Sequence, residues 1–418
     1  MIGTTTTNSD IDSDTEIRPF RIEVPDSVLD DLRDRLARTR WPDEIPMLGW
    51  EYGVPLPCLQ GLADHWRTRF DWRAQEARLN GYPGFMTTID GQPIHFLHVR
   101  SAQPTALPLL MVHGWPGSIA EFLALIDRLV DPVAYGGDAT DAFHLVLPGL
   151  PGFGFAGPTR ETGWHTARTA RAYAELMARL GYDRYGVQGG DLGAFVGPEL
   201  GQVDPEHLLG IHVNAASYGF IPWGEVDDAE LATFSDVERA RLDKVKRFND
   251  EGSAYFQVHA TRPQTIAYAL VDSPAGQLAW IVDRMADWVH GPLDEALTRD
   301  QILTNVMTYW VTNTAGSAAR FYYENMHAQA DWTRQPSKVP VGVAAFAEDV
   351  AIRRYGEQAN NIVHWTDFDR GGHFAAMEAP DLLVGDIREF FRQLRCESGL
   401  IEPNGLDNLG RVGIIRVG

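Results

Sequence analysis

Short, strongly apolar runs alternate with amphipathic stretches along much of the chain. The runs at 107–112 and 143–147 contain no Asp, Glu, Lys or Arg. Continuous apolar runs of this length are typical of parallel strands that helices cover on both faces. Apolar or alternating patterns predict further strands at 93–99, 185–188, 208–213, 341–346 and 362–368. Helical patterns separate these strands, so we expect an α/β protein with a doubly wound, mostly parallel sheet.

The N-terminal part of the chain shows helical patterns with clear start signals. After a short alternating strand at 18–24, residues 26–36 place apolar side chains on one stripe and predict an amphipathic helix. Residues 59–79 return to a helical pattern. Ser118 and Glu121 have the spacing of a capping box, in which each side chain bonds the backbone of the other residue. We therefore expect a capped helix to begin at Ser118.

The alternation of strands and helices stops in the middle of the chain. The stretch between the strands at 208–213 and 341–346 is mostly helical and rich in Trp and Tyr, and we interpret it as an inserted lid. The segment before the sheet combines few regular elements with many tryptophans, so we expect it to wrap the neighbouring core. The predicted division is a disordered tail at 1–17, a wrapping segment at 18–92, an α/β core at 93–216 and 336–395, a lid at 217–335 and a C-terminal tail at 396–418.

Charge and composition restrict the functions that are open to this chain of 418 residues. A net charge of −21 argues against binding to nucleic acid and to anionic membrane surfaces. No apolar run approaches the roughly 20 residues of a membrane span, and the N-terminus lacks a signal region. Cys58 and Cys396 are too few for a disulfide framework or a structural zinc site. We expect a cytoplasmic protein that holds neither metal nor cofactor.

The sequence Gly189-Gly-Asp-Leu-Gly193 follows the predicted strand at 185–188 and precedes a helical pattern. Small residues two places before and after a reactive side chain are typical of a nucleophile elbow, a strained turn between strand and helix. Taken alone, the motif is also a plain glycine-rich turn. The loops after other strands favour the elbow, with Asp191 as the nucleophile.

Two loops later in the chain supply the partners of a catalytic triad. Asp349 follows one predicted strand, and His373 follows the last one. The order nucleophile, acid, histidine is that of α/β-hydrolases, and open α/β sheets place their chemistry at the carboxyl ends of strands. Glu348 is an alternative acid, and a plain loop histidine is the alternative for His373. We interpret His113 as a structural residue of the loop that supplies N–H donors.

A carboxylate nucleophile determines the class of reaction. Attack on a carbonyl would give an anhydride, whereas attack on an sp³ carbon gives an alkyl ester that water can hydrolyse. His373 would activate that water, and Asp349 would orient His373. The backbone N–H groups of Trp115 and Leu192 would hold the oxyanion on Asp191. Epoxides and alkyl halides are the two substrate classes that suit such a site.

An ordered set of motifs resembles the microsomal-type epoxide hydrolases, including their soluble bacterial members. The set covers about residues 18–395 and comprises Arg18-Pro-Phe, Arg40-Trp-Pro, His113-Gly-Trp-Pro-Gly-Ser, Pro151-Gly-Phe-Gly-Phe, Gly189-Gly-Asp-Leu-Gly, Asp272-Ser-Pro, Thr304-Asn-Val-Met-Thr-Tyr-Trp, Arg320-Phe-Tyr-Tyr-Glu-Asn and Gly371-Gly-His-Phe-Ala-Ala-Met-Glu. The resemblance implies an α/β-hydrolase fold and hydrolysis of an epoxide to a diol, with small epoxides and water as the partners and pairing as a homodimer. The membrane anchor of the microsomal members has no counterpart in this sequence.

The family's roles are carried over where the motifs match. The resemblance implies that Asp191 is the nucleophile, His373 the base and Asp349 its charge partner. Ala347 stands where the family usually has proline, which leaves Glu348 open as the acid. The family's lid tyrosines fall on Tyr255 and Tyr322, whose phenols would donate to the epoxide oxygen. Tyr323 is the alternative to Tyr322, and core packing is the alternative for each of these tyrosines.

Four side chains are expected to form the wall of the substrate site: Trp115, Phe153, Leu192 and Phe374. Leu192 stands where some relatives carry tryptophan, so this wall differs between them. A haloalkane dehalogenase and a non-catalytic binding protein of the same fold are the alternative functions. A serine-type esterase is disfavoured because Asp191 occupies the elbow.

Overall fold

The computed structural model describes residues 15–400 except 218, 223 and 330–335. Of the tails predicted at 1–17 and 396–418, residues 1–14 and 401–418 lie outside the described residues, and the last helix, α18 (Pro380–Glu397), extends past the predicted start of the C-terminal tail. Within the described part of the chain, nine strands form one sheet in the order β1-β2-β3-β5-β4-β6-β7-β8-β9. The strands are β1 (Arg18–Phe20), β2 (Gly84–Ile89), β3 (Gln92–Val99), β4 (Leu107–Val112), β5 (Phe143–Pro148), β6 (Tyr185–Gly190), β7 (Leu208–Asn214), β8 (Pro340–Ala345) and β9 (Asn361–Asp367).

The sheet is antiparallel at its N-terminal edge and parallel elsewhere. Strands β1, β2, β3 and β5 pair antiparallel in that order, whereas β4 to β9 pair in parallel. The mostly parallel sheet confirms the predicted fold class. Two details differ from the prediction: the strand expected at 18–24 ends at Phe20, and β2 was not predicted because its residues show no regular alternation.

Helices cover both faces of the sheet, as two neighbouring residues of β6 show. A Cβ atom on Gly186 would lie 2.4 Å from Phe391 of α18 (Pro380–Glu397), so this face lies directly against that helix. The next residue, Val187, lies beside Gly197 of α7 (Gly193–Val203). Successive side chains of a strand point to opposite faces, so α7 and α18 cover opposite faces. The remaining helices of the sheet region are α5 (Ile126–Val130), α6 (Thr166–Arg179), α16 (Arg353–Ala359), α17 (Ala375–Glu378) and the 3₁₀ turns η1 (Ile119–Ala124), η2 (Pro132–Tyr135), η3 (Ala139–Asp141) and η4 (Gly154–Ala156).

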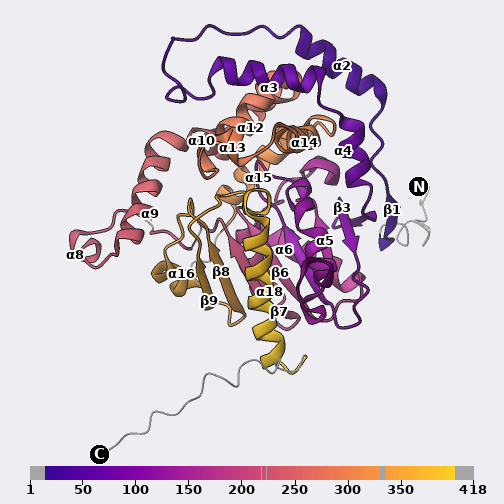
Figure 1. The fold of residues 1–418 in the computed structure, drawn as a ribbon, viewed down its shortest axis with the longest axis vertical. Coiled ribbons are helices and arrows are strands. Elements are labelled where there is room, and N and C mark those ends of the chain that lie inside the picture. Colours follow the sequence, from indigo (N-terminus) through magenta and orange to yellow (C-terminus); the bar gives the residue numbers. More distant parts are fainter. Residues whose placement is uncertain (1–14, 218, 223, 330–335, 401–418) are drawn as a thin grey trace, which may run out of the picture.

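The chain between β7 and β8 is mostly helical; in Figure 1 its first helices lie to the left of the sheet and the later ones above it. Its helices are α8 (Asp228–Leu231), α9 (Asp236–Arg247), a π-helical turn η5 (Phe248–Gly252), α10 (Ala254–Thr261), α11 (Pro263–Asp272), α12 (Pro274–Trp288), α13 (Leu293–Ala296), α14 (Arg299–Trp310) and α15 (Ala315–His327). No helix among the described residues is long and apolar enough to cross a membrane.

The N-terminal segment packs on these helices at the top of Figure 1. It contains α2 (Asp26–Ala37), α3 (Leu56–Thr68) and α4 (Trp72–Leu79). Arg35 pairs with Asp272 at 2.9 Å, which ties α2 to the end of α11. The single helix predicted at 59–79 is wrong, because the chain breaks at Asp71, whose side chain accepts a hydrogen bond from Ala74 N–H and starts α4. Asp is a preferred residue at such a helix start.

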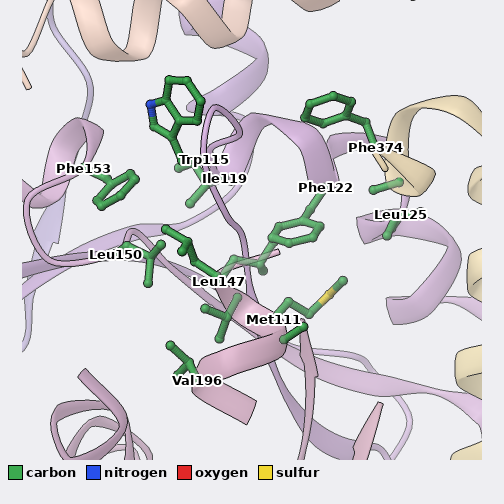
Figure 2. Close-up of a cluster of buried hydrophobic side chains, with 14 of the residues drawn as sticks. Met111, Trp115, Ile119, Phe122, Leu125, Leu147, Leu150, Phe153, Val196 and Phe374 are labelled. Carbon is green, nitrogen blue, oxygen red and sulfur yellow. The ribbon is translucent and has the colours of Figure 1, made fainter. Parts of the chain in front are cut away.

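One apolar core joins the sheet to the layers around it. Figure 2 shows part of it, where Met111 and Leu147 of neighbouring strands lie close to Phe122 of η1 and Val196 of α7. All four side chains are at most 2 % exposed. The carboxyl ends of the strands lie directly above this packed layer, so the loops that follow them start from fixed positions.

Candidate active site

Asp191 sits on a sharp turn between β6 and α7. Its φ angle is +52°, a conformation that residues other than glycine rarely adopt. Two glycines make the turn sterically feasible. A Cβ atom on Gly193 would lie 2.0 Å from the carbonyl oxygen of Val112, and one on Gly189 would lie 2.5 Å from the Gly193 backbone. The turn therefore requires small residues at both places and holds the carboxylate above the end of the sheet.

The two oxygen atoms of Asp191 have different surroundings. Oδ1 accepts a hydrogen bond of 2.9 Å from the backbone N–H of Trp115. The N–H of Leu192 also stabilises the carboxylate electrostatically, but the only well-formed backbone bond in the described structure comes from Trp115. Oδ2 faces the Nε2 atom of His373 at 3.5 Å. Burial raises the pKa of Asp191, and His373 and these N–H groups offset part of that rise.

His373 lies in the loop between β9 and α17, against an aromatic wall. Its backbone N–H donates to the carbonyl oxygen of Trp288 at 3.0 Å, and its ring packs on the Trp288 ring at 4.6 Å between centroids. The preceding Gly372 allows this approach, since a Cβ there would lie 2.5 Å from the Trp288 oxygen. Burial lowers the pKa of His373, and the Asp191 carboxylate offsets part of that effect. The neutral imidazole is therefore favoured, which is the form that accepts a proton.

The two candidate acids after β8 have distinct partners. Asp349 is 7 % exposed and accepts hydrogen bonds from the N–H groups of Ala215 at 3.0 Å and Ala351 at 2.9 Å. Glu348 instead pairs with Lys244 at 2.7 Å and His290 at 3.1 Å. Among the described residues, no hydrogen bond joins either acid to His373. Asp349 is thus the buried acid of the pair, held by backbone donors.

Tyr255 of α10 and Tyr322 of α15 meet above Trp115. The Tyr255 ring stacks on Trp115 at 4.9 Å and 11°, and Tyr322 contacts both rings edge to face. The Tyr322 hydroxyl is buried without a hydrogen-bond partner in the described structure. Burial raises the pKa of both phenols, which keeps them protonated as donors. Tyr323 lies elsewhere, 36 % exposed and stacked on His327.

The loop that carries Trp115 is fixed by His113, which is buried. The N–H of Leu150 can only donate, so Nε2 of His113 must accept at 3.1 Å. The proton of the neutral ring therefore sits on Nδ1, which donates to the carbonyl oxygen of Gly114 at 2.9 Å. Burial lowers the pKa of His113 to about 4, so the ring stays neutral. His113 thus joins the Trp115 loop to the loop after β5.

A cavity of about 20 Å³ lies beside Asp191. Its lining consists of Gly114, Trp115, Gly117, Glu121, Phe122, Gly190, Asp191, Asn214, His373, Phe374, Ala375, Ala376 and Leu383. Of the four predicted wall residues, the cavity touches Trp115 and Phe374. Phe153 instead packs on His113, in the apolar cluster that Figure 2 shows, and Leu192 is buried outside the lining. No group of three or more metal-ligating side chains occurs among the described residues.

Glu121 is a site residue that the sequence analysis missed, because it was assigned to a capping box. That assignment is wrong. The first turn is a 3₁₀ helix, in which the N–H of Glu121 already donates to the carbonyl oxygen of Ser118 at 3.0 Å. The Ser118 side chain accepts from Ala120 N–H instead, at 3.3 Å. The Glu121 carboxyl is left to face the cavity, and only the tighter 3₁₀ winding would have indicated this.

Comparison with known proteins gives a consistent result along the chain. Residues 17–122 match the family described as epoxide hydrolase N terminus, and residues 108–380 match the α/β hydrolase fold. A Stigmatella aurantiaca protein, provisionally named an epoxide hydrolase, is 47 % identical over 386 residues, covering 91 % of this chain and 86 % of that protein. Epoxide hydrolase 1 of Oryctolagus cuniculus is 35 % identical, covering 90 % of this chain and 89 % of its own length.

Solved structures show the same similarity. The juvenile hormone epoxide hydrolase of the silkworm Bombyx mori superposes with a TM-score of 0.83 at 28 % identity, covering 93 % of this chain and 97 % of that one. The Aspergillus niger epoxide hydrolase superposes with a TM-score of 0.79 at 32 % identity, covering 91 % and 97 %. The similarity therefore extends over the sheet, the helices above it and the N-terminal segment.

Proposed function

The chain belongs to the epoxide hydrolase family of the α/β-hydrolase fold, and we propose that it opens an epoxide to a vicinal diol through a covalent ester on Asp191. It is a hydrolase that acts on epoxides, as its named relatives are. The observation that carries the mechanism is that the two carboxylate oxygens of Asp191 have different partners. Trp115 N–H holds Oδ1, while Oδ2 faces Nε2 of His373 at 3.5 Å.

In the first step, Oδ2 of Asp191 attacks an epoxide carbon, and the carbon–oxygen bond of the ring breaks. The ring oxygen takes a proton from a phenol of Tyr255 or Tyr322, which leaves a hydroxyl group on the substrate and a phenolate on the protein. The two tyrosines support this role because they are buried, remain protonated and converge over Trp115. The product of the step is an alkyl ester of Asp191.

In the second step, water loses a proton to Nε2 of His373 and its oxygen attacks the ester carbon of Asp191. Negative charge then develops on Oδ1, where the Trp115 N–H already points. Collapse of this intermediate breaks the ester bond, and His373 returns a proton to the departing diol. The acid proton left on Asp191 passes back to the phenolate, so atoms and charge balance over the cycle.

We place Asp349 as the charge partner of His373. Its burial and its position in the loop after β8 support this choice, whereas Glu348 is engaged with Lys244 and His290. During hydrolysis of the ester, His373 transiently gains a proton from water. A buried carboxylate nearby favours this protonated form of His373. The backbone N–H groups of Ala215 and Ala351 keep the carboxylate in a fixed position.

We also propose that residues 217–335 act as a lid and that residues 18–92 hold it in place over the core. The tyrosines of the site come from α10 and α15, which supports the first part, and the Arg35–Asp272 ion pair supports the second. A cavity of about 20 Å³ has room for roughly one water, so the site must open further before an epoxide reaches Asp191.

Pairing as a homodimer and residence in the cytoplasm are further proposals. Exposed apolar side chains gather on one loop of the N-terminal segment and support pairing, since such patches tend to be covered: Ile45, Met47, Trp50 and Tyr52. Cys58 and Cys396 are both unbonded, which suits a reducing compartment. Light scattering should report the mass of two chains, and the mass of one chain would remove the dimer.

The test of the function is a panel of aryl and alkyl epoxides of different size, with chiral analysis of the diols. Conversion by the native chain and loss of conversion in Asp191→Ala support the proposal. A parallel panel of alkyl halides, followed by halide release, tests dehalogenation. Halide release without diol formation would assign the chain to the other substrate class.

A further inference from the structure

The small cavity beside Asp191 is lined only by segments of the sheet region. Its walls come from residues 114–122, from 190–191, from Asn214 and from the 373–383 segment. No residue of α10 or α15 lines it, so it does not include the phenols that would face the epoxide. Its volume of about 20 Å³ exceeds the roughly 10–15 Å³ that one water requires. This cavity therefore has room for one water at a place separate from the two phenols.

Four polar side chains face this space: Asp191, His373, Asn214 and Glu121. A buried water needs two to four polar partners, so the cavity is chemically suited to one. Asn214 is fixed because its Oδ1 accepts from Gln188 Nε2 at 2.8 Å. Asp191 and His373 already have roles in the proposed mechanism. Glu121 is the ionisable group of the lining that this mechanism leaves unused.

The Glu121 carboxyl lies directly against Gly117. A Cβ atom on Gly117 would lie 2.2 Å from Glu121 Oε2, so the carboxyl occupies space that any larger residue at 117 would fill. Among the described residues, its oxygens make no hydrogen bond. The 3₁₀ turn keeps its backbone N–H bonded to Ser118 and its side chain directed at the cavity. A carboxyl group without a protein partner, next to a water-sized polar space, points to water as its partner.

We propose that this cavity holds the water that hydrolyses the ester, and that Glu121 positions this water by accepting one of its hydrogens. The inference rests on the proposed covalent mechanism. The water donates one hydrogen to Nε2 of His373 and the other to Glu121, which aims its oxygen at the ester carbon of Asp191. His373 takes the proton, and the water oxygen stays on Asp191 when the diol leaves. Glu121 gains and loses nothing over the cycle, so it is a positioning residue.

Formation of the ester in the first step changes the charge next to Glu121. Burial and the negative charge of Asp191 both raise the pKa of Glu121 in the free enzyme. Formation of the ester removes the charge of Asp191 and with it that repulsion. Burial still raises the pKa of Glu121 in the ester, but the ionised form, which is the stronger acceptor, costs less at the stage when water must attack.

The test separates ester formation from ester hydrolysis in single turnovers with excess enzyme, with intact-protein mass to detect the ester. Glu121→Gln keeps the shape of the side chain and removes its charge. We expect hydrolysis to slow by about tenfold or more and ester formation to stay within about threefold, so that the ester accumulates. Glu121→Asp, which draws the carboxylate back by one methylene, should show the same selective loss. Ser118→Ala is the matched control from the same turn and should leave both steps near the native rates.

Two outcomes overturn the inference. Hydrolysis at the native rate in both folded Glu121 variants would show that the carboxyl does not position the water. An equal fall of both steps would assign Glu121 a structural role. The result with His373→Gln distinguishes a failure of this inference from a failure of the covalent mechanism on which it rests. If His373→Gln traps the ester and Glu121→Gln does not, only the role of Glu121 fails, whereas absence of ester in every variant removes the covalent mechanism.

Discussion

Nε2 of His373 lies 3.5 Å from Oδ2 of Asp191, the carboxylate oxygen that the Trp115 N–H does not hold. The distance is longer than a hydrogen bond, and no other acceptor bonds to that ring nitrogen among the described residues. Oδ2 is thus available to attack carbon. The same nitrogen lies within reach of a water placed at the carboxyl carbon. This contact therefore places the nucleophile, Asp191, next to the base, His373, as a reaction in two steps requires.

The first prediction concerns the acid of the triad. Asp349→Asn should slow hydrolysis of the ester by about 10²-fold or more and affect its formation less, because His373 loses the charge that stabilises its protonated form. Single-turnover rates of the two steps measure this. Glu348→Gln is the matched control, since it removes only the partly exposed ion pairs with Lys244 and His290. The reverse ranking of the two variants would assign the role to Glu348.

The second prediction concerns the two lid phenols. Tyr255→Phe and Tyr322→Phe should each raise the barrier to ester formation by roughly 1.5–3 kcal/mol, the worth of a hydrogen bond to a developing charge. Either phenol can donate alone, so the double variant should be far slower than both. Tyr323→Phe is the control on the same helix, because Tyr323 stacks on His327 away from the site. Ester formation at the native rate in the double variant would make both rings packing residues.

The third prediction concerns the pH dependence of ester hydrolysis. Burial lowers the pKa of His373 below its usual value of about 6.5, and the charge of Asp191 works against that shift. Ester formation removes the Asp191 charge, so the pKa falls further in the intermediate. His373 acts as a base only when neutral, and hydrolysis should therefore stay constant as pH falls to 6.5 and decline only below it. Decay of the trapped ester, followed against pH, measures this. A decline that begins above 6.5 would contradict the prediction.

The fourth prediction concerns stability far from the site. Asp386 of α18 is buried and bonds both His212 at 2.8 Å and His364 at 2.9 Å. Asp386→Asn removes the charge at the centre of this cluster and should lower the free energy of unfolding by about 3–5 kcal/mol. Asp381→Asn on the same helix is the control. It breaks the exposed ion pair with Arg370 and the contacts of the carboxylate with the N–H groups of Asp381 and Leu382, and should cost about 1 kcal/mol or less. Denaturant unfolding at pH 6 compares them.

The same cluster has a defined pH window. Burial opposes ionisation of Asp386, but the hydrogen bonds from His212 and His364 prevail and lower its pKa, so its stabilisation is lost as pH falls below about 4. The bond to Asp386 raises the pKa of His364 against the effect of burial. That contribution is complete below about pH 6.5 and is lost as pH rises through the raised value. The difference between the native chain and Asp386→Asn should therefore be largest between these limits, and a difference independent of pH would contradict this.

Much of this arrangement follows from the sequence because parallel strands end at one edge of a sheet. The sequence patterns before Asp191, Asp349 and His373 predict three strands, and because parallel strands end at one edge their loops are expected to fall close together. The glycines around Asp191 are required by contacts of 2.0–2.5 Å, which explains why the elbow is visible as a motif. The sequence therefore predicts best where backbone geometry restricts the choice of residue.

The features that the sequence did not indicate depend on tertiary context. Strand β2 forms by antiparallel pairing with β3, and its own residues show no alternation. The break between α3 and α4 depends on the Asp71 cap within a continuous helical pattern. Glu121 has the spacing of a capping residue, and only the 3₁₀ winding of its turn directs it to the cavity. Local spacing cannot reveal which of two helical geometries the packed chain adopts.

The most direct test of the mechanism follows the oxygen that enters the diol. In a single turnover with excess enzyme in ¹⁸O-water, attack by Asp191 should yield largely unlabelled diol, with the label left in the Asp191 carboxylate. A second turnover in unlabelled water should then release labelled diol. His373→Gln should hold the ester on the peptide that contains Asp191, and Asp191→Ala should form none. Labelled diol in the first turnover, with no ester in any variant, would show that activated water attacks the epoxide directly and would contradict the role of Asp191.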